Sequence, residues 1–397
     1  MMQPGAGEAA APGGRERGSM KRYDFDGFSL ELDCPVEVGR EAGHFWFPTI
    51  HPVKGRDLLC LAVTTDDKAQ GKWPGVLSRS RDGGASWARA RTIDSYGPNS
   101  LPLGQRRLLL MPYELWPVSP GDRRNARADG TVLSCPLKGA LSAETAAVRF
   151  LDFPQDLADY HKGELCILTN GNILPIGDRL LFTTLYGRCV GDDRYTNFAV
   201  ISEDGGFTWR FLSTVARPEG DADVAEGPDE SNTVRLADGR LLCVYRVGSG
   251  LEYRKSYSAD AGRTWTRPQV VEGAWSVEPQ LVRLRNGLIL LSGGRPGLLL
   301  WGCADGEGDR WEPVNLAEHH NALFPDSSLR YSDVFCQAKE PCEPAQSTSY
   351  TGMKAVGPNE VVVCYDRLGN GWAGAPGPWG QHDVVFCVRV RAARRRR

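Results

Sequence analysis

The sequence lacks long hydrophobic stretches and has few of the residues that usually bind metals. No apolar run approaches the roughly 20 residues that a membrane helix needs. Of the 6 histidines, only His319 and His320 stand close together, in a segment that we expect to be a surface loop. The 11 cysteines include no Cys-x-x-Cys pair. We therefore expect no membrane span, no metal site and no organic cofactor.

An excess of charge of one sign is also absent. The chain has 47 Lys and Arg against 49 Asp and Glu, a formal net charge of −2, so nucleic acid is not an expected partner. Residues 1–22 are rich in small and polar residues and predict a disordered tail rather than a signal peptide. Residues 392–397 predict a basic C-terminal tail. The odd number of cysteines and the absence of Asn-x-Ser/Thr favour a cytoplasmic protein, which we expect to be a monomer.

Helical periodicity is scarce, and short β-rich runs with Gly, Asp and Asn turns take its place. Among them the pattern Ser-x-Asp-x-Gly-x-Ser/Thr-Trp occurs at residues 80–87, 202–209 and 258–265, with a degenerate copy at residues 303–311. The Asp side chain can accept backbone N–H groups, and Gly tolerates a positive φ, so the pattern predicts a tight turn. This repeated turn is the Asp-box, and its predicted role is structural.

A strand, a turn and a second hydrophobic strand recur along the chain. The second strands are predicted at residues 58–60, 108–110, 180–182, 241–245, 288–291 and 361–363. Repeats of this size and composition predict an all-β fold, a six-bladed β-propeller with Asp-box turns over residues 23–391. A β-sandwich is the alternative, but it does not explain a fixed repeat.

Propeller geometry predicts where a site should form. Residues at the same repeat position converge on one end of the central channel. Eight residues before the turn, the last three repeats have Glu230, Glu278 and Tyr350. Their second strands end near Arg246, Arg295 and Asp366. Two arginines can grip a carboxylate, and a Glu beside a Tyr can accept the phenol proton, so this set predicts a pocket for an acidic ligand.

Three segments, residues 229–246, 294–296 and 348–353, resemble those that carry catalytic residues in sialidases. The resemblance covers roughly residues 40–391 and implies that Tyr350 is the nucleophile and Glu230 its base. It also implies that Arg246 and Arg295 are two of the three arginines that hold the substrate carboxylate. The family's general acid is an Asp in a loop before the first Asp-box, where Asp67 fits best and Asp66 is the alternative.

One departure from the family concerns the first arginine. Sialidases begin the first blade with Phe-Arg-Ile-Pro, whereas this chain has Trp46 at the position of the Arg. We expect Trp46 to offer an aromatic platform for the apolar face of a sugar. Arg188 and Arg367 are the cations that could replace the missing arginine.

These features predict an exo-acting, retaining glycoside hydrolase that releases a terminal acidic sugar, such as sialic acid, from a glycan. Its expected substrate-binding residues are Arg246, Arg295, Trp46, Glu278 and Asp366. One alternative is a propeller that binds carbohydrate without cleaving it. Another is a propeller with different carbohydrate chemistry, such as a lyase or a deoxy-sugar hydrolase.

Overall fold

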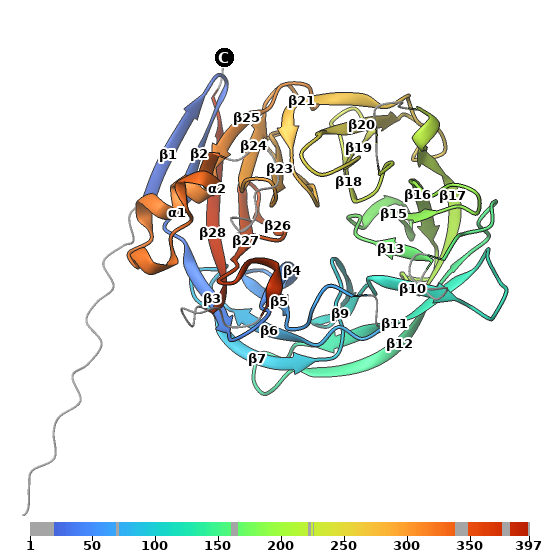
Figure 1. Ribbon diagram of the computed structural model, residues 1–397, viewed down its shortest axis with the longest axis horizontal. Helices are drawn as coiled ribbons and strands as arrows, with labels where there is room; N and C mark the ends of the chain where they lie inside the picture. Colours follow the sequence, from blue (N-terminus) through green and yellow to red (C-terminus); the bar gives the residue numbers. More distant parts are fainter. Residues whose placement is uncertain are drawn as a thin grey trace, which may run out of the picture.

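The computed structural model describes residues 20–68, 71–159, 166–220, 224, 226–337, 348–374 and 382–395. It is an all-β fold whose sheets stand in a ring around a common centre, following the chain from blue to red (Figure 1). Three sheets have four strands in chain order, each paired with the next. The first consists of β4 (Trp46–Lys54), β5 (Asp57–Val63), β6 (Gly75–Ser80) and β7 (Ala88–Ile93). The second consists of β18 (Ser231–Arg235), β19 (Leu241–Tyr245), β20 (Glu252–Ser258) and β21 (Gln269–Trp275). The third consists of β22 (Gln280–Arg283), β23 (Ile289–Gly293), β24 (Leu299–Cys303) and β25 (Glu312–Asn315).

A ten-stranded sheet fills the next part of the ring. Its first half contains β8 (Ser100–Gly104), β9 (Arg107–Leu110), β10 (Glu114–Pro117), β11 (Ala126–Ser134) and β12 (Ser142–Leu151). Its second half contains β13 (Ile167–Thr169), β14 (Leu174–Gly177), β15 (Leu180–Arg188), β16 (Tyr195–Ser202) and β17 (Thr208–Ala216). The halves join where β12 pairs in parallel with β17 and where β10 pairs with both β11 and β13. The predicted six blades require this sheet to count as two, and the six-blade count stays a prediction.

The two ends of the chain close the ring in one sheet. It combines β26 (Thr351–Gly357), β27 (Glu360–Arg367) and β28 (Asp383–Arg394) with the N-terminal β1 (Met20–Phe25), β2 (Phe28–Asp33) and β3 (Val36–Glu41). Both β2 and β3 pair with β28, so the blue and red strands lie side by side (Figure 1). Strand β28 extends to Arg394, which corrects the predicted start of a C-terminal tail at residue 392. The predicted N-terminal tail lies almost wholly outside the described residues.

Buried apolar side chains join each sheet to the next. Val234 and Val244 of one sheet pack with Leu281 and Leu291 of its neighbour, around the fully buried Trp301. Similar clusters join the closing sheet to its neighbours on both sides. The ten described cysteines are free thiols, most of them buried in these cores.

The repeated Ser-x-Asp-x-Gly segments form one common turn. In the turn after β16, Ser202 Oγ donates to Asp204 Oδ1 (2.9 Å) and accepts the N–H of Gly206 (3.0 Å), while Asp204 Oδ1 accepts the N–H of Thr208 (2.9 Å). Equivalent bonds form in the turns at residues 80–87 and 258–265. The hydrogen bonds satisfy backbone groups that strand pairing leaves free.

The turn glycine also determines how closely two strand sets approach. Gly206 has φ +94°, and a Cβ added there would lie 2.7 Å from a Leu101 side-chain carbon in the preceding half-sheet. Gly262 would meet Phe182 at 2.6 Å, and Gly308 would meet Leu242 at 2.6 Å. Each of these turns therefore packs against the strands that precede it in the ring, and only glycine fits there.

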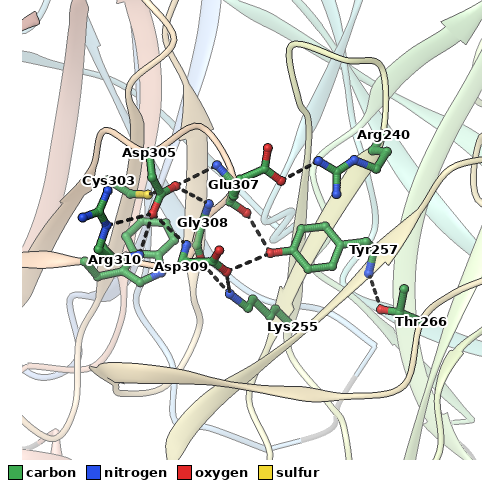
Figure 2. A network of polar contacts seen from close by, with 11 residues as sticks. Arg240, Lys255, Tyr257, Thr266, Cys303, Asp305, Glu307, Gly308, Asp309 and Arg310 are labelled. Atoms are coloured by element: carbon green, nitrogen blue, oxygen red, sulfur yellow. Dashed lines mark hydrogen bonds and ion pairs between the residues drawn. The ribbon is translucent and has the colours of Figure 1, made fainter. Parts of the chain in front are cut away.

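Polar contacts reinforce the junction beside the degenerate fourth turn (Figure 2). Asp305 accepts N–H groups from its own turn, including that of Gly308 at 2.9 Å. From the preceding sheet, Arg240 pairs with Glu307, Lys255 pairs with Asp309, and Tyr257 Oη donates to the carbonyl of Glu307 (2.8 Å). This turn contacts its neighbour through ion pairs as well as apolar packing.

The helices are few and short. They are α1 (Leu316–Leu323), α2 (Asp333–Gln337) and the 3-10 turns η1 (Pro218–Gly220), η2 (Ser327–Leu329) and η3 (Gly371–Ala373). His319 and His320 lie in α1 and are fully buried, which corrects the expected surface loop; His320 Nδ1 lies 3.1 Å from Tyr365 Oη. Within the described ranges, no helix has the length and apolar character that crossing a membrane requires.

The close approach at Gly206 gives a test with an internal control. Replacing Gly206 with Ala imposes a left-handed backbone on an L-residue and a clash with Leu101, so we expect a loss of about 2–4 kcal/mol in the free energy of unfolding. Gly205→Ala has a similar φ of +83° but open space around its Cβ, so we expect only about 1 kcal/mol. Urea titrations of both variants measure the difference, and equal losses would contradict the packing role.

Candidate functional site

Five of the predicted residues stand at matching positions on three successive sheets. Glu230 directly precedes the inner strand β18, and Tyr350 directly precedes the inner strand β26. Arg246 directly follows the second strand β19, and Arg295 lies just after β23. Glu278 stands two residues before the inner strand β22. Because every inner strand starts at the same end of the ring, these side chains meet despite their separation in sequence.

A cavity of about 380 Å³ opens at this point. It is lined by Asp67, Trp73, Tyr113, Glu114, Leu168, Tyr186, Tyr195, Glu226, Asp229, Glu230, Arg246, Arg295 and Tyr350. The volume lies at the small end of the usual range for ligand sites. The structure thus brings together Tyr350, Glu230, Asp67, Arg246 and Arg295.

The Glu230 carboxylate is the centre of the site. Tyr350 Oη donates a short hydrogen bond to its Oε1. Its Oε2 accepts the backbone N–H of Glu278 (2.7 Å) and pairs with Arg246 Nη1 (3.3 Å). Burial, followed by the charge of Glu230, raises the pKa of Tyr350 well above its ordinary value. The resting site therefore holds a neutral phenol whose proton points at a carboxylate.

Glu278 acts on this centre from below rather than from the cavity. Its backbone is left-handed (φ 47°), which directs its N–H toward Glu230. Its side chain accepts hydrogen bonds from Asn170 Nδ2 and Gln280 Nε2, both at 3.0 Å, and does not line the cavity. Burial and the charge of Glu230 raise the pKa of Glu278 to about 8. Glu278 is a positioning residue, which corrects its expected role in binding substrate.

Carboxylates surround Arg246 on three sides. Its guanidinium lies 2.7 Å from Glu226 Oε2, 3.3 Å from Glu230 Oε2 and 3.9 Å from Asp229 Oδ2. Burial lowers the pKa of Arg246, but these carboxylates outweigh burial and hold the pKa well above its usual value. Arg246 is therefore a charged residue with its own counterions in place.

Arg295 is held mainly by aromatic rings. Its guanidinium carbon lies 4.3 Å from the ring centre of Trp372 and 5.3 Å from that of Tyr350. Its Nη1 lies 3.5 Å from the carbonyl oxygen of Ser349. These contacts orient the cation toward the cavity and beside the tyrosine.

Two predicted binding residues turn out to be structural. Trp46 is fully buried, donates from Nε1 to the carbonyl of Thr65 (2.8 Å) and packs on Trp372, with ring centres 4.7 Å apart. Asp366 is also fully buried and accepts the N–H of Phe47 (3.0 Å) and the hydroxyl of Thr348 (3.0 Å). Neither lines the cavity, so the expected aromatic platform at Trp46 and the expected ligand contact at Asp366 are wrong. Asp366 instead secures the segment that leads into Tyr350.

Neither proposed replacement for the first arginine lines the cavity. Arg188 stacks on the ring of Tyr195 at 4.6 Å, and Arg367 donates to the carbonyl of Arg330 at 3.3 Å. Of the two candidate acids, only Asp67 lines the cavity, because Asp66 pairs with Lys68 and accepts from Thr65 Oγ1.

Several lining residues were not singled out from the sequence. Asp229 is buried beside Arg246, and burial raises its pKa well above the usual range, against the opposing charge of that arginine. Tyr113 and Glu114 follow β9, the position that Arg246 occupies after β19. The same repeat rule, applied to the earlier strands, could have found them. The wall formed by Trp73 comes from an irregular loop, which no repeat predicts. Across the described residues, no group of three or more His, Cys, Asp or Glu is placed to hold a metal.

Comparisons with known proteins connect this geometry to a fold. No protein-family model matches the sequence, and no curated protein does either. Solved structures do match. An alpha-L-arabinanase from Penicillium chrysogenum, in complex with arabinobiose, has 15% identity and a TM-score of 0.54, over 89% of this chain and 98% of its own. An alpha-L-arabinofuranosidase from Fusarium graminearum has 11% identity and a TM-score of 0.54, over 90% and 97%.

A sialidase from Trypanosoma rangeli, in complex with a difluoro sugar acid, has 16% identity and a TM-score of 0.51. The match covers 88% of this chain but only 53% of the sialidase chain. At these identities the similarity shows a shared fold, the β-propeller of these glycoside hydrolases.

The buried Glu278 gives a pH-dependent test of the site. Its pKa rises from 4.5 to about 8 on folding, so between these values the folded state binds more protons and stability falls as pH rises. Glu278→Gln removes this dependence. We expect the wild-type protein to lose stability relative to this variant from pH 5 to 8, by at most about 1.4 kcal/mol per pH unit.

Urea unfolding at several pH values measures this difference. The exposed Glu272, changed to Gln, is the matched control and should leave the slope unchanged. Parallel curves for the wild-type protein and Glu278→Gln would show that Glu278 titrates normally.

Proposed function

We propose that this protein is a retaining, exo-acting glycoside hydrolase with a six-bladed propeller and Asp-box turns, which releases one terminal sugar from a glycan. The observation that carries the proposal is the hydrogen bond from Tyr350 Oη to the buried Glu230 carboxylate in the cavity. A phenol is a weak nucleophile, and an adjacent base is what makes it reactive. The sialidase, arabinanase and arabinofuranosidase of the same fold support glycosidase chemistry in general.

In the first step, Tyr350 Oη attacks the anomeric carbon as the bond to the leaving oxygen breaks. The phenol proton passes to Glu230 Oε1, and Asp67 protonates the leaving oxygen. The positive charge of Arg246, 3.3 Å from Glu230, and the N–H of Glu278 keep the carboxylate oriented for this transfer.

In the second step, water attacks the same carbon while the Asp67 carboxylate takes the water's proton. The bond between Tyr350 and the sugar breaks, and Glu230 returns the proton to the phenolate. Two displacements at one carbon give net retention.

A carbohydrate-binding protein without hydrolytic activity is the second candidate. It is favoured by one observation: Asp67 is exposed, although a general acid usually has a pKa raised by burial. The same cavity would then bind a terminal sugar and leave it intact.

The nucleophile assignment is tested with Tyr350→Phe and Glu230→Gln. We expect each to lower kcat/KM on the best fluorogenic glycoside about 10²–10⁴-fold, because each removes one partner of the proton transfer. The control is Tyr257→Phe at the remote junction of Figure 2, which should keep wild-type activity. Full activity of either site variant would exclude this mechanism, and binding without turnover by the wild-type protein would favour the second candidate.

The general acid is tested with two adjacent residues. Asp67→Asn should impair hydrolysis of a methylumbelliferyl glycoside about 10²-fold or more, but impair the dinitrophenyl glycoside much less, because a good leaving group needs no proton. Asp66→Asn should behave like the wild-type protein with both. The reverse result would assign the acid to Asp66, and equal losses with both leaving groups would remove Asp67 from this role.

A further inference from the structure

The cavity carries more acidic than basic side chains. Its described lining has five carboxyl groups, from Asp67, Glu114, Glu226, Asp229 and Glu230, and two guanidinium groups, from Arg246 and Arg295. If Asp229 is taken as neutral because burial raises its pKa, four carboxylates still face two cations. A ligand that brings another carboxylate would add to this excess.

Arg246 is not available to a new anion without an exchange. Glu226 Oε2 already accepts from Arg246 Nη2 at 2.7 Å, and Glu230 Oε2 lies 3.3 Å from its Nη1. An incoming carboxylate would have to displace Glu226, whose side chain is 39% exposed and stands at the rim. Displacing one carboxylate with another gives little net gain in attraction.

No other described cation makes up for this. Trp46 stands in the core where the sialidase pattern has an arginine, and Arg188 and Arg367 do not line the cavity. Arg295 alone remains accessible to an anion, and its guanidinium is stacked on Trp372.

The remaining wall suits an uncharged sugar ring. Trp73, Tyr113, Tyr186 and Tyr195 contribute aromatic surface, and Leu168 adds an aliphatic contact. Aromatic faces cover the apolar C–H faces of a sugar, while the surplus carboxylates can accept hydrogen bonds from its hydroxyl groups.

We propose that the cavity selects a neutral terminal sugar and disfavours acidic sugars, and that Glu226 is the specificity-determining residue because it occupies Arg246. This inference rests on the proposed function for its reaction, but ligand binding tests it separately.

The first experiment compares neutral and acidic sugars directly. The wild-type protein is assayed on methylumbelliferyl glycosides in pairs that differ in one carboxylate, glucoside with glucuronide and galactoside with galacturonide, together with arabinofuranoside, sialic acid and its deaminated analogue. Binding of the corresponding free sugars to Tyr350→Phe is measured by ligand-detected NMR. We expect the best substrate and the best ligand to be neutral, with acidic sugars at least about tenfold weaker.

The second experiment tests Glu226. In Glu226→Gln, Arg246 loses a charged partner, so we expect the ratio of acidic to neutral sugar binding to rise at least about tenfold. The exposed Glu272→Gln is the control and should leave the ratio unchanged.

The outcomes separate the two proposals. A preference for acidic sugars in turnover and binding would overturn the inference and leave the glycosidase intact. Selective binding of neutral sugars with no turnover of any glycoside would overturn the glycosidase and support the inference. Failure of both classes to bind, or an unchanged ratio in Glu226→Gln, would overturn the inference.

Discussion

One carboxylate joins three sheets of the ring at the candidate site. Glu230 begins the β18–β21 sheet, receives the N–H of Glu278 from the next sheet and receives the hydroxyl of Tyr350 from the closing sheet. A buried carboxylate is costly unless donors and an opposite charge surround it. Arg246 supplies that charge from the same sheet. Any shift of one sheet relative to the next would therefore leave an unsatisfied charge, so the site depends on the register of the whole ring.

The repeated turns are what maintain this register. In three of them the turn glycine lies so close to the preceding strands that a single added carbon would clash, at 2.6–2.7 Å. This packing sets the spacing on the outside of the ring, while Glu230 and its partners set it near the centre. The closing sheet uses both chain ends, β2 and β28, so the same spacing must also accommodate the termini.

The sequence predicts what repeats and misses what does not. Counting back from each turn located Glu230, Glu278 and Tyr350, because the distance from a turn to the start of the inner strand is fixed by the strand pairing. The same count could not say whether a side chain faces the cavity or the core. Trp46 and Asp366 show this, since a bulge between Trp46 and Thr49 and the hydroxyls near Tyr350 decide their orientation. Glu226 and Trp73 lie in loops whose paths depend on tertiary contacts, so no pattern identified them.

The magnitude of charge pairing decides how the missing arginine should be interpreted. A charge-assisted hydrogen bond in a dry site contributes about 1.5–3 kcal/mol, which is enough to select an acidic sugar when the cations are free. Here Arg246 already makes such contacts with Glu226 and Glu230, so a substrate carboxylate could only exchange one pair for another. With Trp46 in the core, the contribution of the first arginine is absent as well. What remains to distinguish sugars is the fit of a ring against Trp73, Tyr113 and the other aromatic side chains, and this depends on shape rather than on charge.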